Sequence, residues 1–159
     1  MTFRWALLLP GFTAALVGAA GLARQSGPMR GVADAAQARV DYQLKCQGCH
    51  RIDGGGDDRS NPPMRDMVAR FLTVPGGREF LARVPGVATV DLDDQRLANL
   101  VNWTIYTFDP QHVPKDFRPY TSAELGRLRQ NPLLLERAET RARLVAGLTL
   151  AGRHGDIMK

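Results

Sequence analysis

The chain has 159 residues, of which 44% are hydrophobic, and its 21 Lys and Arg against 16 Asp and Glu give a net charge of +5. This length suggests one domain that can bury a real core, with room for an appendage. A basic surface favours an acidic protein, an anionic membrane face or nucleic acid, or it is simply a solvated basic surface. The chain has no run of aromatic residues interleaved with Lys and Arg, so we expect no nucleic-acid partner.

The N-terminus has the layout of a secretory signal. Arg4 precedes an apolar stretch from Trp5 to Leu22, and small residues close the stretch near Ala23. A positive start, an apolar middle and a small-residue cleavage site are typical of export, so we assign residues 1–23 to a signal peptide cleaved after Ala23. An uncleaved membrane anchor is the alternative, although the stretch is near the lower limit for crossing a bilayer. Both interpretations place the remainder outside the cytoplasm, in the periplasm.

The predicted body begins after a short leader. Residues 24–31 contain Gly and Pro and are expected to form that flexible leader. From Val32 to Leu44 the apolar residues recur at helical spacing, which predicts the first helix. The body as a whole is assigned to residues 32–110.

The only two cysteines, Cys46 and Cys49, lie in the sequence Cys-Gln-Gly-Cys-His that ends at His50. CxxCH is the attachment signature of c-type haem. Two thiols on one helical turn can each add to a vinyl group of the porphyrin, and the histidine that follows supplies an axial nitrogen to the iron. The sequence therefore predicts one covalently attached haem c. A zinc site would need a second pair of ligands, a thioredoxin-like pair would need a preceding strand, and a plain disulfide would leave His50 without a role.

Gly- and Pro-rich segments separate short helices after this motif. Residues 51–63 are expected to form a loop, and the apolar spacing from Met64 to Leu72 predicts a short helix. The sequence Pro75-Gly76-Gly77 breaks the chain, Arg78 to Val84 is a second short helix, and Pro85-Gly86 turns the chain again.

The strongest helical pattern follows. Asp91 can cap this helix, with Asp94 strengthening its start. An apolar stripe runs from Leu97 to Phe108, and the Asp109-Pro110 pair ends the helix. Every predicted element is helical, so the fold class is all-α.

Residues 111–159 are assigned to a C-terminal helical extension. Thr121 and Glu124 form a capping box for a short helix through Arg129. A second helical stretch, from Leu133 to Leu150, mixes leucines with arginines. Two interpretations stand: the extension wraps the body or docks on a partner, or it is a partly ordered basic tail.

The residues from about Val32 to Phe108 resemble a class I cytochrome c. That family has a first helix, the CxxCH motif, a loop, short helices, and a terminal helix that crosses the first. The first helix of the family carries a small residue and an aromatic ahead of the haem cysteine, and the terminal helix packs a leucine and an aromatic against them. The positions that match are Ala38, Tyr42, Leu100 and Trp103. The resemblance implies a cytochrome c-like fold around one covalent haem.

The resemblance also implies further contacts around the haem. Pro62 lies in an Asn-Pro-Pro-Met stretch that matches a Gly-Pro-x-Leu-like stretch of the family, so its carbonyl is expected to accept a hydrogen bond from His50. Arg78 or Arg83 could hold a haem propionate, or be a solvated surface charge. Trp103 could reach a propionate with its indole N–H, or pack between helices.

The sixth iron ligand is where the chain departs from the family. Family members usually supply a methionine from the loop before the terminal helix, but residues 83–90 hold no methionine, histidine or lysine. Met64 and Met67 are weak candidates, because they match positions that pack apolar side chains on the haem. His112 is a further candidate and is expected on the surface. The distal side is thus open, bound to water, or ligated by a residue that the sequence does not reveal.

The predicted function is that of an exported electron carrier, not an enzyme. It would take single electrons from a dehydrogenase or a quinol-oxidising complex and pass them to a downstream cytochrome or an oxidase. Its redox partners are expected to have acidic docking surfaces, and membrane contact is expected only if residues 1–23 are retained. The alternatives are a cytochrome subunit of a dehydrogenase, and an open-site haem protein that acts as a gas sensor or a peroxidase-like enzyme.

Overall fold

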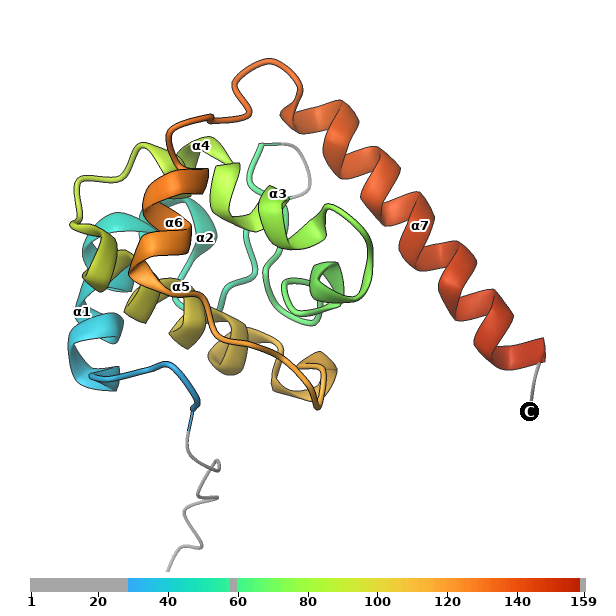
Figure 1. Ribbon diagram of the computed structural model, residues 1–159, viewed down its shortest axis with the longest axis horizontal. Helices are drawn as coiled ribbons and strands as arrows, with labels where there is room; N and C mark the ends of the chain where they lie inside the picture. The colour runs from blue at the N-terminus through green and yellow to red at the C-terminus, as the bar shows by residue number, and fades with distance from the viewer. Residues whose placement is uncertain (1–28, 58–59, 158–159) are drawn as a thin grey trace, which may run out of the picture.

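The computed structural model describes residues 29–57 and 60–157, so the predicted signal peptide and most of the leader lie outside the described residues. Within these residues every element is helical, as the sequence predicted (Figure 1). In chain order the elements are α1 (Ala35–Lys45), α2 (Gln47–His50), η1 (Arg70–Thr73), α3 (Gly77–Arg83), α4 (Pro85–Ala88), α5 (Asp94–Phe108), η2 (Pro110–His112), α6 (Ser122–Leu128) and α7 (Arg137–Ile157). No helix among the described residues is long and apolar enough to cross a membrane.

Helices α1 and α5 pack together and form the centre of the fold. Asp34 caps α1 by accepting a hydrogen bond of 2.8 Å from the Gln37 amide. Ala38 and Tyr42 are almost completely buried, and the Tyr42 ring lies 5.6 Å from that of Trp103 on α5. The small and aromatic positions predicted on the first helix are therefore part of the helix–helix contact.

The N-cap of helix α5 lies two residues later in the chain than the sequence predicted. Asp93, not Asp91, is the N-cap, and its carboxylate accepts a hydrogen bond of 2.8 Å from the Arg96 amide. The prediction of Asp91 as the cap is wrong. Leu92 is buried in the core, and the residue after it, Asp93, stands at the start of the first helical turn, where its side chain can cap the helix.

The segment before α3 is less helical than its apolar spacing predicted. Met64 to Leu72 forms turns, and only the 3₁₀ helix η1 is regular. Asp66 has a left-handed φ of 57°, and its amide donates to the Phe108 carbonyl (3.1 Å) instead of to a local helical partner. This long-range bond overrides the local helical preference.

Helix α3 starts after Gly76, which caps it with a left-handed φ of 80°, and α4 forms where a simple turn was expected. Pro85 occupies the first turn of α4, a position that suits its fixed φ and its missing N–H.

The extension wraps the body up to residue 133. Phe117, Tyr120 and Leu125 are buried in the main core. The buried Asn102 amide donates to the Tyr120 carbonyl (3.0 Å) and accepts from the Tyr120 amide (2.8 Å). The predicted capping box is present, because Thr121 caps α6 and accepts from the amide three residues on. The extension is therefore joined to α5 by both packing and hydrogen bonds.

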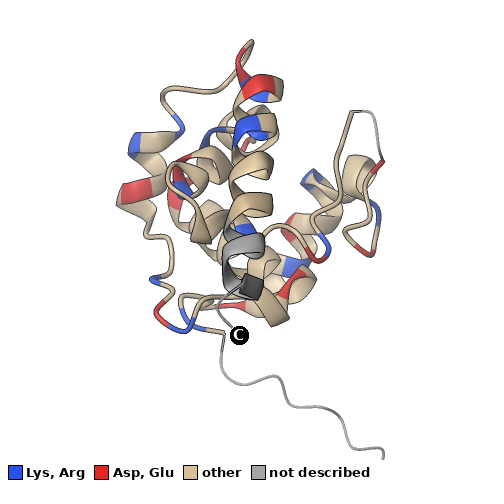
Figure 2. Ribbon diagram, turned by 90° about the vertical axis from the view of Figure 1, so that its right-hand side faces the viewer, with Lys and Arg blue, Asp and Glu red and all other residues tan. Residues whose placement is uncertain are grey.

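Helix α7 covers a second, smaller apolar cluster on the outside of η1 and α3 (Figure 1). The rings of Phe71 and Phe80 lie 5.2 Å apart in this cluster, and Leu144 of α7 is buried against them. Figure 2 shows α7 facing the viewer, with charged residues along its first half. In the link before α7, Leu134 and Leu135 are exposed. Helix α7 contacts the body through one face of its middle turns, which packs on the second cluster.

Candidate functional site

The two cysteines lie on one tight helical turn at the junction of α1 and α2. Cys46 ends α1 and begins α2, and its carbonyl accepts hydrogen bonds from the amides of Cys49 (3.2 Å) and His50 (2.9 Å). Both thiols are free; Cys49 is exposed and Cys46 is half-buried. The turn thus presents two sulfur atoms and an imidazole from five consecutive residues, which is the arrangement that covalent haem attachment requires.

Among the described residues, no group of three or more His, Cys, Asp or Glu side chains is arranged to hold a metal ion. Burial, with a smaller contribution from the carboxylate of Asp41, raises the pKa of Cys46 to about 11. Cys46 is therefore a neutral thiol at neutral pH.

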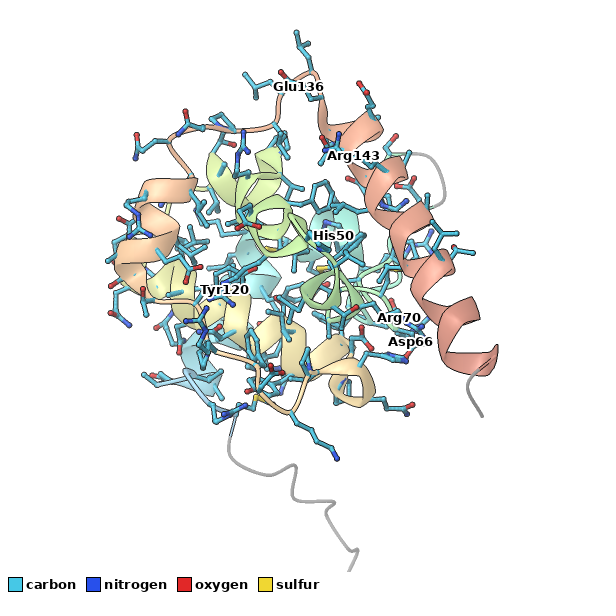
Figure 3. The ribbon with its side chains drawn as sticks, turned by 45° about the vertical axis from the view of Figure 1, so that its right-hand side comes forward. His50, Asp66, Arg70, Tyr120, Glu136 and Arg143 are labelled. Carbon is cyan, nitrogen blue, oxygen red and sulfur yellow. The ribbon has the colours of Figure 1, made fainter. Side chains whose placement is uncertain are left out.

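His50 is half-buried, and burial lowers the pKa of its imidazole. The charge of Asp57 and the carbonyl of Pro62 act in the opposite direction and are the smaller causes. The neutral imidazole is the form that has a lone pair available for iron. Figure 3 shows His50 in the middle of the molecule, while Asp66 and Arg70 lie nearer to α7.

The Nδ1 atom of His50 is buried and has no hydrogen-bond partner among the described residues. The Pro62 carbonyl is one of the groups that raise the pKa of the imidazole, and the hydrogen bond that the resemblance implies between Pro62 and His50 stays a prediction. Free thiols on one turn and a neutral imidazole fit a haem whose axial ligand is His50. The roles of Cys46, Cys49, His50 and Pro62 remain predictions on which the proposal below is built.

Tyr42 fixes the orientation of the attachment turn. Its hydroxyl donates to the Arg51 carbonyl, and the His50 carbonyl lies 3.4 Å away. Burial is the main cause that raises the pKa of Tyr42 to about 12, so the side chain stays a phenol and a donor. The aromatic position that the sequence predicted for packing thus also holds the backbone of the turn.

Gly56, one of the glycines of the predicted loop, is essential for the position of Pro62. Gly56 has a φ of 57°, and a Cβ atom there would lie 2.0 Å from the Asn61 carbonyl oxygen. No other residue type fits such a close backbone approach without movement. The run of three glycines after His50 was the available signal for this crossing.

Trp103 lies in an aromatic cluster beside the attachment helix. Its ring is 5.6 Å from that of Tyr42 and 5.7 Å from that of Phe108, edge to face with the latter. Its helix–helix packing is therefore evident, and its predicted contact with a haem propionate stays a prediction.

The candidate sixth ligands lie in different surroundings. Met64 and Cys46 both pack against the main core, and the Met64 amide donates to the Gly54 carbonyl (2.8 Å). Met67 packs against the second cluster. His112 is only partly exposed, and its Nδ1 atom pairs with the buried carboxylate of Asp109, which also accepts from an amide. His112 is thus held by a carboxylate rather than lying free on the surface.

The two arginines considered for the haem propionates both bond to the extension. Arg78 forms two hydrogen bonds to the Glu124 carboxylate (2.6 and 2.7 Å), and its guanidinium lies 4.0 Å from the centre of the Tyr120 ring. Arg83 donates to the Asn131 carbonyl (2.6 Å). The interpretation of Arg78 as a solvated surface charge is therefore wrong, and the contact of either arginine with a haem propionate stays a prediction.

A third arginine, which the sequence did not single out, fixes the loop before α5. Arg129 donates to the carbonyls of Ala88 (3.1 Å), Val90 and Leu92 (2.8 Å), and pairs with Asp94 (3.1 Å). This is the loop in which the family usually carries its methionine. Its backbone is therefore held by the extension.

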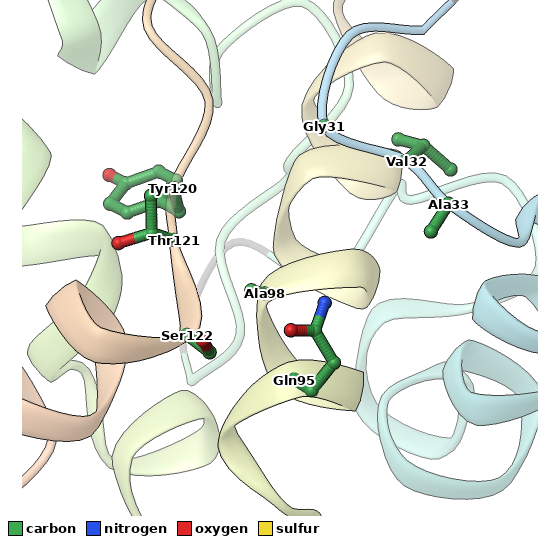
Figure 4. A pocket seen from close by; sticks show the side chains of 8 residues that line it. All are labelled: Gly31, Val32, Ala33, Gln95, Ala98, Tyr120, Thr121 and Ser122. Atoms are coloured by element: carbon green, nitrogen blue, oxygen red, sulfur yellow. The ribbon is translucent and has the colours of Figure 1, made fainter.

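A pocket of about 400 Å³ lies away from the attachment turn, between the segment before α1, α5 and the start of α6 (Figure 4). No charged side chain lines it, and none of its residues belongs to the CxxCH segment. The lining residues are Gly31, Val32, Ala33, Gln95, Ala98, Tyr120, Thr121 and Ser122.

Comparison with known proteins agrees with this site. No protein-family model matches the chain, and no solved structure matches it. Two curated proteins are similar, both named Cytochrome c-552 and both from Thermus thermophilus, the second from a particular strain of that organism. Each is 29% identical over 107 residues, and the match covers 56% of this chain and 82% and 72% of the two relatives. The similarity is a distant homology to small class I c-type cytochromes that carry one covalent haem c.

Proposed function

We propose that this chain, a class I c-type cytochrome with one covalently attached haem c, is a periplasmic shuttle that carries single electrons from a dehydrogenase or a quinol-oxidising complex to a downstream cytochrome or an oxidase. As a cytochrome c it is an electron carrier and not an enzyme. The observation that carries the proposal is the single turn on which two free thiols and a neutral, half-buried imidazole lie together.

The haem supplies the one-electron chemistry, since its iron alternates between the ferrous and ferric states. The side chains of this protein hold it. Cys46 and Cys49 would form the two thioether links, and His50 would supply the axial nitrogen. Tyr42 keeps the backbone of the turn in place through its hydrogen bond to the Arg51 carbonyl. A fixed ligand set of this kind favours fast electron transfer, because little has to move when the charge changes.

Export is supported by the N-terminal sequence pattern. Residues 1–23 have the layout of a cleavable signal, with an uncleaved anchor as the alternative. Mass spectrometry of the mature protein from a periplasmic fraction tests cleavage after Ala23.

Redox partners with acidic docking surfaces are supported by the net charge of +5. Electrostatic steering raises the rate of encounter and is screened by salt. Turnover with the partner is therefore expected to fall as ionic strength rises, and rates independent of salt would contradict the steering.

The decisive experiment is expression in a host that matures c-type cytochromes. We expect a coloured protein whose mass includes one haem that survives denaturation, with an absorption spectrum that changes reversibly on one-electron reduction. Replacing both cysteines with alanine should abolish covalent attachment. A colourless wild-type protein at the mass of the bare polypeptide would refute the proposal.

An open-site haem protein is the second candidate, supported by the loop before α5. Residues 83–90 contain no side chain that commonly ligates haem iron, and Arg129 holds the carbonyls of this loop. A carbon monoxide difference spectrum of the reduced protein separates the two candidates. Rapid binding at neutral pH favours the open site, and no binding favours a carrier whose iron has six ligands.

A cytochrome subunit of a dehydrogenase is the third candidate, since α7 presents a largely exposed outer face that could dock. Purification of the native complex from its source tests this candidate, because a permanent subunit should co-purify with its dehydrogenase.

A further inference from the structure

Helix α7 is held to the body by apolar contacts. Its Leu144 is buried in the second cluster together with Phe71 and Phe80. Between Arg137 and Thr149, no hydrogen bond or ion pair joins α7 to the body within the described residues. Because apolar contacts are not directional, this stretch of α7 can leave the body without breaking a polar contact, and it can form the same contacts with any surface of the same shape.

The link from α6 to α7 is fixed to the body at one point only. The Arg83 side chain donates to the Asn131 carbonyl (2.6 Å), and the Leu133 amide donates to the Arg83 carbonyl (2.8 Å). Leu133 itself is buried, whereas Leu134 is 63% and Leu135 is 92% exposed. The chain can therefore change direction after Leu133 while the body and the first part of the extension stay in place.

We propose that α7 is an exchangeable arm that binds the second apolar cluster of another copy of this chain, so that two copies form a dimer in which each body carries its partner's α7. The inference goes beyond the proposed function and does not depend on it. A second copy is the occupant that fits, because α7 is already complementary to this cluster and the same two surfaces meet in the dimer. Each contact is made twice, so the assembly is two-fold and closed.

The exposed leucines of the link give the dimer a contact that the monomer lacks. In the monomer Leu134 and Leu135 lie largely in water. In an exchanged dimer the two links pass each other between the bodies, which brings these two leucines of each copy together at the two-fold axis. Removing aliphatic surface from water is favourable in proportion to its area, so this contact favours exchange over the closed monomer.

The length of the link determines the concentration at which exchange should occur. A short link keeps α7 near its own cluster at an effective concentration of about 1 mM, so exchange without further contacts would need about 1 mM protein. The leucines at the two-fold axis should lower the dissociation constant about tenfold, to about 0.1 mM. The dimer is therefore expected only in concentrated solution.

The first test measures the mass of the haem-loaded full chain by size-exclusion chromatography with light scattering, over a series of concentrations up to about 1 mM. Leu134→Ser combined with Leu135→Ser should raise the dissociation constant of the dimer about tenfold. The matched control is Leu44→Ser combined with Ile52→Ser, because these side chains are 71% and 72% exposed but belong to the body. This control should have the dissociation constant of the wild type.

A mixture of two defective variants separates exchange from contact between surfaces. Leu144→Asp has an intact cluster and an α7 that cannot dock. Val74→Asp has an intact α7 and a cluster that cannot accept it, because a Cβ atom on Gly147 of α7 would lie 3.7 Å from the Val74 Cγ1 atom. Each variant alone should be monomeric, and the mixture should form a dimer, since the intact α7 of one variant docks on the intact cluster of the other.

Circular dichroism and the haem absorption spectrum of each variant show whether its body is folded. If an aspartate unfolds the body, the pair Leu144→Ala and Val74→Ala should give the same pattern with a weaker dimer. A wild type that stays monomeric up to about 1 mM would overturn the proposal. So would a mixture of folded variants that stays monomeric. A dimer of Leu144→Asp alone that is as stable as that of the wild type would also overturn it, because the exposed leucines would then associate without exchange of α7.

Discussion

Replacing Arg129 with methionine should destabilise the protein by about 3 kcal/mol. The substitution keeps an unbranched side chain of similar length and removes the guanidinium that donates to the carbonyls of Ala88, Val90 and Leu92. The side chain is only 15% exposed, so water replaces these bonds poorly. With about 1 kcal/mol for each of three hydrogen bonds whose acceptors lose their donor, the total is about 3 kcal/mol.

Urea unfolding of the haem-loaded protein measures this loss. For a slope of about 2 kcal/mol per molar urea, the midpoint should fall by about 1.5 M while the slope stays the same. Arg127→Met is the matched control, because Arg127 is exposed and, within the described residues, donates only to the Ala123 carbonyl of its own helix, so its effect should stay within about 0.5 kcal/mol. If Arg129→Met and Arg127→Met unfold at the same urea concentration, the hydrogen bonds to the loop do not stabilise the fold and the reasoning is wrong.

Three further predictions concern the extension and the attachment turn. The hydrogen bonds from Arg78 lower the pKa of Glu124 in the folded state. The pair therefore stabilises the fold above the pKa of an unfolded glutamate, and this stabilisation is lost as the pH falls through the lowered pKa of the folded state. In urea unfolding between pH 6 and pH 3, Glu124→Gln should lose less stability than the wild type. Leu144→Ala should weaken the docking of α7 by about 2 to 5 kcal/mol, and trypsin should then cleave within α7 faster while the body stays intact; unchanged cleavage would mean that this leucine does not hold the helix. In the haem-free protein, iodoacetamide should modify Cys49 before Cys46, because burial both shields the Cys46 thiol and raises its pKa to about 11; peptide mass spectrometry that finds the opposite order would contradict this.

The attachment turn could be predicted almost completely from the sequence because its chemistry is local. Cys46, Cys49 and His50 fall on one turn whatever the rest of the chain does, once that turn is helical. Helices α1 and α5 were also predictable, since their apolar spacing is strong and they pack on each other. The cap of α5 was wrong by two residues because several aspartates stand close together and only the path of the chain through Leu92 decides among them.

The segment from Met64 to Leu72 shows where local patterns fail. Its apolar spacing suits a helix, but the amide of Asp66 bonds to the carbonyl of Phe108, and the amide of Ala69 bonds to the carboxylate of Asp109. These partners lie some forty residues away, so no window of sequence reveals them. The backbone around the two candidate methionines is consequently held by the end of α5 rather than by a helix of its own.

The arginines of the body show the same limit of local patterns. The resemblance to the family extends only to about Phe108, so it offered haem groups or water as partners for Arg78 and Arg83. Their actual partners, Glu124 and the Asn131 carbonyl, belong to the extension. Charge alone predicts that an arginine needs an acceptor but not which one, and an extension that lies beyond the resemblance can supply it.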